Sequence, residues 1–157
     1  MVEMTIDAGL QAVTAAATRL SGIDGEMGEL IIAGYPLEVL APQAAYEEVL
    51  FLLWYDLLPT TAELSKLQTQ LTTQRALSPV ILDMLREAAA QQVAVMDALR
   101  MGAGMLSLGL TDASDLRMAA LRAVAAFPTL VAAYWRLRSG QQPIAPRDDL
   151  GHAANYL

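Results

Sequence analysis

Residues 78–108 read SPVILDMLREAAAQQVAVMDALRMGAGMLSL, and this stretch predicts two consecutive helices. Ser78 is a favourable N-cap residue, and Pro79 suits the first helical position, where its missing N–H costs nothing. The apolar side chains that follow recur at intervals of three and four residues, which places them on one helix face. We therefore expect a helix from Pro79 to about Ala90, whose apolar face contains Ile81, Leu82 and Leu85.

The second helix of this stretch, expected from about Val93 to Leu108, has Gly102-Ala103-Gly104 in its middle. Each glycine lowers the helix propensity by up to about 1 kcal/mol. In return, the small residues leave a flat surface on which another helix can come close. The larger apolar side chains of this helix are Met96, Leu99, Met105 and Leu106.

A longer helix, expected from about Ser114 to Leu137, is apolar almost all round. A helix without a polar face is buried on all sides. A chain of 157 residues offers few places to bury it, which favours a partner chain. In the whole chain, 55% of the residues are hydrophobic and 17% are charged. The alternative explanation of this apolar composition is a core rich in alanine and leucine within the chain itself.

The C-terminal residues predict a linker followed by a helix without an end. Arg136, Arg138 and Gly140 are typical of a helix C-terminus. Residues 141–150 read as a linker, and residues 151–157 begin a helix that has no closing signal. We therefore expect the chain to be truncated.

Helices are also expected before residue 78, so that residues 37–140 form a helical region and the fold class is mainly α. Residues 45–55 have helical spacing of apolar side chains, with two glutamates near the start. Thr60 and Glu63 have the spacing of a capping box, which predicts a helix that runs to about Gln74.

A β-hairpin is expected in residues 8–36. Asp24-Gly25 opens a turn that Gly28 closes, between two short apolar segments. Gly34-Tyr35-Pro36 is expected to end the second strand.

Composition and charge exclude several classes of function. The formal net charge is −7 with a single lysine, so the chain lacks the basic face of a nucleic-acid-binding protein. It has no cysteine, which excludes disulfides and thiolate chemistry. The first residues do not resemble a signal peptide, and the uncharged apolar stretch 123–135 is shorter than a membrane span of about 20 residues. We therefore expect a cytoplasmic protein that does not bind a membrane.

The side chains that could carry chemistry form no catalytic constellation. His152 is the only histidine, and it is expected in the first turn of a helix. The carboxylate pairs Glu47-Glu48 and Asp148-Asp149 are expected to be solvated, because neighbours on a helix point apart. The glycines at positions 22, 25 and 28 lack the Lys-Ser/Thr of a phosphate loop. The sequence therefore predicts no catalytic, cofactor-binding or metal-binding residue.

Several short motifs follow one another in a definite order. They are Gly9-Leu10-Gln11-Ala12-Val13, Ile23-Asp24-Gly25-Glu26, Gly34-Tyr35-Pro36-Leu37-Glu38, Tyr46-Glu47-Glu48-Val49-Leu50, Met96-Asp97-Ala98-Leu99-Arg100, Phe127-Pro128-Thr129-Leu130 and Leu150-Gly151-His152-Ala153-Ala154-Asn155. In this order they resemble the citrate synthase family, over nearly the whole chain. The family often has His-Pro before Met-Asp and an arginine before Gly-Tyr, where this chain has Ala94-Val95 and Ala33.

The resemblance implies a two-domain, nearly all-helical dimeric acyltransferase of the tricarboxylic acid cycle type, which condenses oxaloacetate or a related keto acid with acetyl-CoA or propionyl-CoA. In that family an aspartate takes a proton from the acetyl methyl group, histidines polarise the carbonyl groups and arginines hold the dicarboxylate. These residues lie in motifs downstream of this chain, so none of them is carried over. The chain alone is therefore predicted to be inactive.

The resemblance also implies a dimer, because the helices at 93–108 and 114–137 correspond to family helices that pack against their copies. We expect a homodimer through residues 93–137. Its candidate interface residues are Met96, Leu99, Gly102, Ala103, Gly104, Leu106, Leu121, Val124, Phe127 and Val131.

Two interpretations of the whole chain stay open. It is the N-terminal part of a citrate-synthase-like large domain, either truncated or one half of a split enzyme whose downstream half carries the catalytic residues. Alternatively, it is a non-catalytic dimerisation or regulatory module related to that family.

Overall fold

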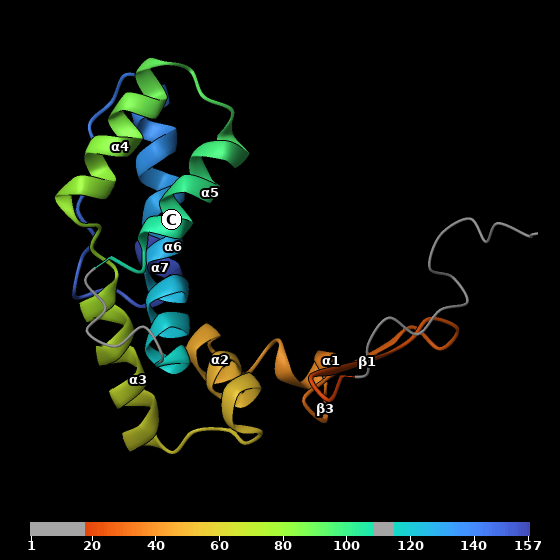
Figure 1. The fold of residues 1–157 in the computed structure, drawn as a ribbon. Coiled ribbons are helices and arrows are strands. Elements are labelled where there is room, and N and C mark those ends of the chain that lie inside the picture. Colours follow the sequence, from red (N-terminus) through yellow and green to blue (C-terminus); the bar gives the residue numbers. More distant parts are fainter. Residues whose placement is uncertain (1–17, 109–114) are drawn as a thin grey trace, which may run out of the picture. The chain divides into compact units, whose positions relative to one another are not determined.

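The computed structural model describes residues 18–108 and 115–157, which belong to two compact units. The first unit comprises residues up to 45 together with 49–58, and the second comprises residues 46–48 together with 59–157. Figure 1 shows the order of the elements along the chain. Residues 8–17 of the predicted hairpin region and the expected helix start at Ser114 lie outside the described residues.

The first unit contains the predicted hairpin. Strands β1 (Ser21–Asp24) and β2 (Glu29–Ile32) are antiparallel, with Ser21 opposite Ile32 and Asp24 opposite Glu29. An Asp24 carboxylate oxygen accepts hydrogen bonds from the backbone N–H groups of Glu26 and Met27, at 3.0 and 2.9 Å. These bonds explain why an aspartate stands at the last position of β1, with Gly25 after it.

Of the next two elements of the first unit, the strand was not predicted, whereas the short helix begins the region 37–140 that was expected to be helical. Tyr35–Pro36 forms a third strand, β3, which pairs with β2, and Leu37–Leu40 forms a short helix, α1. The chain reverses between β2 and β3 because Ala33 and Gly34 both adopt positive φ, at 45° and 88°. Gly-Tyr-Pro therefore opens a strand where we expected one to end.

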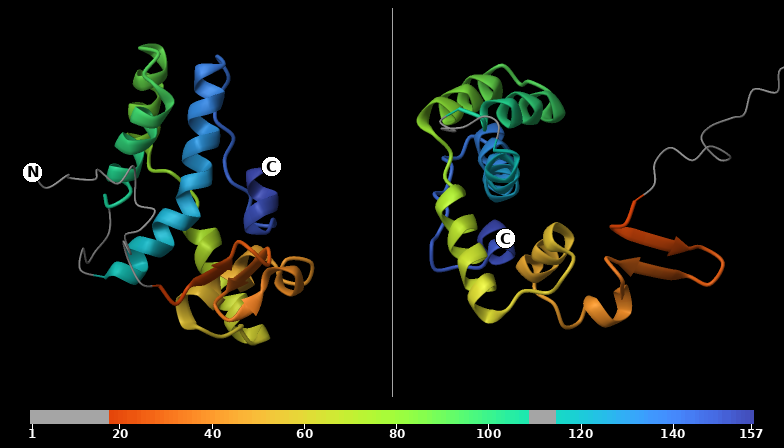
Figure 2. Two further views of the ribbon diagram at one scale, coloured as in Figure 1. Left: turned by 90° about the vertical axis from the view of Figure 1, so that its right-hand side faces the viewer. Right: turned by 60° about the horizontal axis from the view of Figure 1, so that its bottom comes forward.

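The remaining helices agree closely with those expected. They are α2 (Tyr46–Tyr55), α3 (Thr61–Gln74), α4 (Pro79–Ala90), α5 (Val95–Met105), α6 (Leu116–Arg138) and α7 (His152–Tyr156). Within the second unit, α6 packs against α3, α4, α5 and α7. Figure 2 shows α4, α5 and α6 side by side in this unit.

The core of the second unit lies between α4, α5 and α6. Its buried residues are Ile81, Leu85, Ala88, Ala89, Ala98, Leu106, Ala126, Leu130, Ala133 and Tyr134. The hydroxyl of Tyr134 donates a hydrogen bond of 2.5 Å to the Val93 carbonyl, so the one polar atom that this aromatic side chain brings into the core has a partner.

The N-termini of α3 and α4 are defined by two different sequence features. At α3 both halves of the predicted capping box are present, since Glu63 N–H donates to the Thr60 hydroxyl and Thr60 N–H donates to the Glu63 carboxylate. At α4, Ser78 has the expected N-cap position, but its hydroxyl makes no capping bond and is buried without a partner among the described residues. Pro79 at the first position therefore does more than Ser78 to define this start.

Helix α6 was expected to be buried on all sides with the help of a partner chain, and by the described residues of this chain it is only partly buried. Helix α6 is long and apolar enough to cross a membrane, but core helices of soluble proteins can have the same length and composition. Within this structure, 28% of its most apolar window is buried. Its large exposed side chains are Leu116, Phe127 and Trp135. The apolar surface of α6 is therefore only partly used by the described residues of this chain.

Candidate functional site

His152 is the first residue of α7, as predicted, and its ring is buried. The side chain is 5% exposed and stacks on Tyr46, with 4.9 Å between the ring centroids. Its backbone N–H donates a 2.8 Å hydrogen bond to the Glu47 carboxylate. The first turn of α2 thus fixes the start of α7 within the second unit.

Glu47 corrects the expectation that the Glu47-Glu48 pair is solvated, because Glu47 is only 6% exposed. A buried carboxylate is costly unless it accepts hydrogen bonds. Glu47 accepts one from the backbone of α7, so it acts as a side-chain partner for that helix start. The other pair is solvated as expected, and Asp149 forms a surface ion pair with Arg147.

Arg75 is a buried cation that the sequence did not single out. It directly follows α3 and is 2% exposed. Its Nη1 atom donates hydrogen bonds to the carbonyl oxygens of Arg147 and Leu150, at 2.9 and 2.8 Å. Arg75 therefore holds the predicted linker against the end of α3, and only the position of an arginine after a helix hinted at this role.

The surroundings of the His152 ring disfavour its protonation. Burial lowers the pKa of this imidazole below its ordinary value, the positive charge of Arg75 lowers it further, and the Glu47 carboxylate opposes the shift. The Nδ1 atom is buried without a hydrogen-bond partner among the described residues. No carboxylate there orients this ring as a general base would require.

A cleft of about 510 Å³ beside this cluster is lined by Glu47 and Arg75 but not by His152. Its other walls come from α3 and from residues 148–151. The described residues bring together no group of three or more metal-binding side chains. Contacts of Tyr46, Glu47, Arg75 and His152 hold α7 and the linker in place within the second unit.

The predicted interface residues divide into three sets by burial. Met96, Ala103, Gly104 and Phe127 are exposed, Leu99, Val124 and Val131 are half-buried, and Gly102, Leu106 and Leu121 are buried. A Cβ atom on Gly102 would lie 2.3 Å from Leu130 Cδ1, so this glycine allows α5 to approach α6 of the same chain. Gly104 has nothing within 4 Å of an added Cβ, which leaves its surface free for a second copy.

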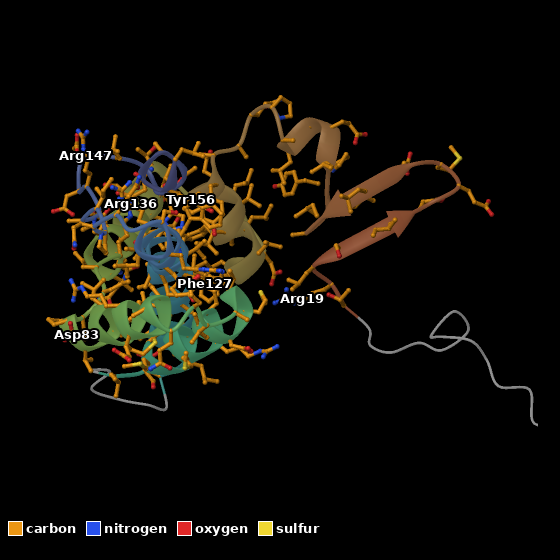
Figure 3. The ribbon with its side chains drawn as sticks, turned by 90° about the horizontal axis from the view of Figure 1, so that it is seen from above. Arg19, Asp83, Phe127, Arg136, Arg147 and Tyr156 are labelled. Atoms are coloured by element: carbon orange, nitrogen blue, oxygen red, sulfur yellow. The ribbon has the colours of Figure 1, made fainter. Side chains whose placement is uncertain are left out.

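A second, more apolar hollow of about 740 Å³ lies between α6, the linker and α7. We did not predict this hollow, because the residues that line it are separated in the sequence and come together only in the folded chain. Arg136 and Tyr156, which both line it, lie close together in Figure 3. We call this hollow the α6–α7 groove; its principal apolar residues are Ala132, Trp135, Ile144, Pro146, Tyr156 and Leu157.

Comparison with known proteins gives a consistent result. A sequence model described as "Citrate synthase, C-terminal domain" matches residues 9–157. The citrate synthase of Haloferax volcanii is 41% identical over 95% of this chain and 41% of its own length. The 2-methylcitrate synthase of Mycobacterium tuberculosis is 34% identical over 97% of this chain and 39% of its own length. The crystal structure of citrate synthase from Pyrobaculum aerophilum has a TM-score of 0.82 at 36% identity, and covers 96% of this chain and 41% of that one.

Proposed function

This chain belongs to the citrate synthase family, and from that premise we propose that it is the N-terminal, non-catalytic part of an acyltransferase large domain. The complete enzyme condenses acetyl-CoA, or another acyl-CoA, with oxaloacetate or a related keto acid. This chain supplies a helical framework and a dimer face, and a downstream half supplies the catalytic residues. The protein works in the cytoplasm.

The observation that carries this proposal is the share of the relatives that the chain spans. It spans about two-fifths of the Haloferax volcanii and Pyrobaculum aerophilum citrate synthases. The site residues of the complete enzyme, as the resemblance implies them, include more than one histidine. The single histidine of this chain is buried against Tyr46 and does not line the adjacent cleft, so it is unsuited to polarising a substrate carbonyl.

The test is a condensation assay on the purified chain, alone and with a downstream half. With oxaloacetate and acetyl-CoA the chain alone should release no free thiol of coenzyme A. Co-expression with the downstream portion of the Haloferax volcanii citrate synthase should yield a complex that releases thiol only when both substrates are present. Thiol release by the chain alone would disprove the non-catalytic assignment.

The same experiment separates the alternative, a non-catalytic dimerisation or regulatory module. Such a module would form a dimer, would bind no coenzyme A and would ignore the downstream portion. A soluble downstream portion that neither co-purifies with the chain nor restores condensation would favour that alternative.

A further inference from the structure

Glu47 and Arg75 are buried charges of opposite sign that do not pair with each other. Glu47 is 6% exposed and Arg75 is 2% exposed. Neither side chain forms an ion pair with any residue that the structure describes. A charge removed from water is costly unless an opposite charge or a full set of hydrogen bonds offsets that cost. Each of these two groups therefore needs a partner that the described residues supply only in part.

Both charged groups have atoms without a hydrogen-bond partner. The protons of Arg75 Nη1 are donated to the carbonyl oxygens of Arg147 and Leu150, whereas Nε and Nη2 donate to no described residue. The guanidinium edge formed by Nε and Nη2 is the kind of donor pair that binds a carboxylate through two parallel hydrogen bonds. On Glu47, Oε1 accepts from the His152 N–H, and no described residue donates to Oε2.

Glu47 and Arg75 line the same cleft of about 510 Å³. This volume lies within the range of about 300–1,000 Å³ that is usual for small-molecule sites. The other walls of the cleft are α3 and residues 148–151, so the whole cleft belongs to the second unit. A buried cation and a buried carboxylate in one cleft favour a ligand that carries both charges, a zwitterion.

The rest of the lining is negatively charged and rich in hydrogen-bond acceptors. Asp148 and Asp149 add two exposed carboxylates; Asp149 pairs with Arg147, and Asp148 has no ion-pair partner among the described residues. The hydroxyl protons of Thr69 and Thr73 are donated to carbonyl oxygens of α3, so towards a ligand these hydroxyls can only accept. The lining therefore favours a second positive charge on the zwitterion.

We propose that this cleft binds a basic α-amino acid, which carries a carboxylate, an α-ammonium group and an amine on its side chain. The carboxylate lies against the Nε–Nη2 edge of Arg75, the α-ammonium group against Glu47 and the side-chain amine against Asp148. Because Glu47 and Arg75 also hold the start of α7 and the linker, the bound amino acid stabilises that part of the second unit. Every residue of this site lies in this chain, so the inference is independent of the proposed function.

The test is isothermal titration calorimetry of the purified chain with L-lysine as the probe. Two analogues each lack one group of L-lysine, since cadaverine has no carboxylate and ε-aminocaproate has no α-ammonium group. Each analogue should bind at least tenfold more weakly than L-lysine. L-lysine should also raise the melting temperature of the chain, because a ligand that binds only the folded state stabilises it.

Three variants test the residues of the site. Glu47→Gln removes the charge but keeps an oxygen that accepts from the His152 N–H, so the variant should fold and should bind L-lysine at least tenfold more weakly. Asp148→Asn, at an exposed position, should weaken binding severalfold. Glu87→Gln is the matched control, because it makes the same change at an exposed position of α4 that does not line the cleft, and it should change the affinity less than twofold. Circular dichroism checks that all three variants fold.

The contrary outcomes are equally distinct. A chain that does not bind L-lysine in the millimolar range would overturn the site, as would an affinity that Glu47→Gln and Asp148→Asn leave unchanged. Cadaverine that binds as tightly as L-lysine would show that the cleft takes cations without using Arg75, and would overturn the assignment of an amino acid. None of these results depends on the condensation assay, so this inference and the proposed function can fail separately.

Discussion

Gly102 shows how one residue sets the distance between two helices. Leu130, which a Cβ at this position would meet at 2.3 Å, is fully buried and has little room to move. We predict that Gly102→Ala lowers the free energy of unfolding by about 1–3 kcal/mol, because overpacking outweighs the gain in helix propensity. Urea denaturation followed by circular dichroism measures this change.

The matched control for that variant is Gly104→Ala, two residues further along the same helix. An added Cβ there meets nothing within 4 Å. In the monomeric chain it should therefore raise the free energy of unfolding by about 0.4–1 kcal/mol, since alanine restricts the unfolded chain. Both glycine variants are therefore compared at a protein concentration at which sedimentation shows a monomer. Equal stabilities of the two variants would contradict the close approach of α5 and α6.

His152 makes the stability of the chain depend on pH. Its folded-state pKa lies below the ordinary value of 6.5, so between these two pKa values the unfolded chain binds a proton that the folded chain does not. The free energy of unfolding should be insensitive to this residue above pH 6.5. Below it, the free energy should fall by up to about 1.4 kcal/mol per pH unit until the folded-state pKa is reached.

Denaturant titrations at several pH values between 7 and 5 measure this dependence. His152→Gln removes the titrating ring, so the variant should lack the part of the slope that lies below pH 6.5. Carboxylates distant from this ring contribute equally to both proteins and cancel in the comparison. Identical slopes for the wild type and the variant would show that the pKa of His152 is the same in the folded and unfolded chains.

At the scale of elements, the sequence predicted what depends on neighbours along the chain. The helices from α2 to α6 were expected to within a few residues, because their caps and apolar periodicity are local signals. The third strand was missed, since Ala33 at positive φ gives no sequence signal of a turn. We also did not predict the burial of Glu47 and Arg75. Their hydrogen-bond partners lie 105 and more than 70 residues away in the sequence, so no local pattern indicates these contacts.

The capping box of α3 gives a prediction at this scale. The Thr60 hydroxyl accepts from Glu63 N–H, and also donates a 2.7 Å hydrogen bond to the Glu63 carboxylate. Thr60→Ala removes both bonds and should lower the free energy of unfolding by about 1 kcal/mol. Thr61→Ala, at the exposed first helical position, should change it by less than about 0.5 kcal/mol. An equal effect of the two substitutions in thermal or urea denaturation would argue against the cap.

At the scale of the whole molecule, the sequence predicted the family and the mainly helical fold, but not the α6–α7 groove. The family could be predicted because the resemblance rests on the order of short motifs, and this order can be read directly from the sequence. The groove depends on how the linker folds back from α6 to α7, and this path is set by Arg75 and Arg136 contacts to backbone carbonyls. Such contacts leave no periodic trace in the sequence.

The apolar surface left on α5 and α6 leads to the last prediction, which concerns assembly. Met96 and Met101 on α5 and Phe127 on α6 are exposed, and a Cβ added at Gly104 of α5 would meet nothing within 4 Å. We predict that the chain forms a two-fold homodimer through this face. Gly104→Arg should convert the dimer to a monomer, because the new side chain places bulk and an unpaired charge in an apolar contact.

Sedimentation velocity at micromolar concentration measures this outcome. Gly25→Arg is the matched control, since it adds the same charge at an exposed turn of the hairpin where nothing lies within 4 Å, and it should leave the dimer intact. Gly102, although it was among the predicted interface residues, is already covered by Leu130, so the dimer contact should depend on Gly104 rather than on Gly102. A wild-type chain that sediments as a well-folded monomer would exclude the dimer, and the exposed apolar surface of α5 and α6 would then have to be covered by the downstream half.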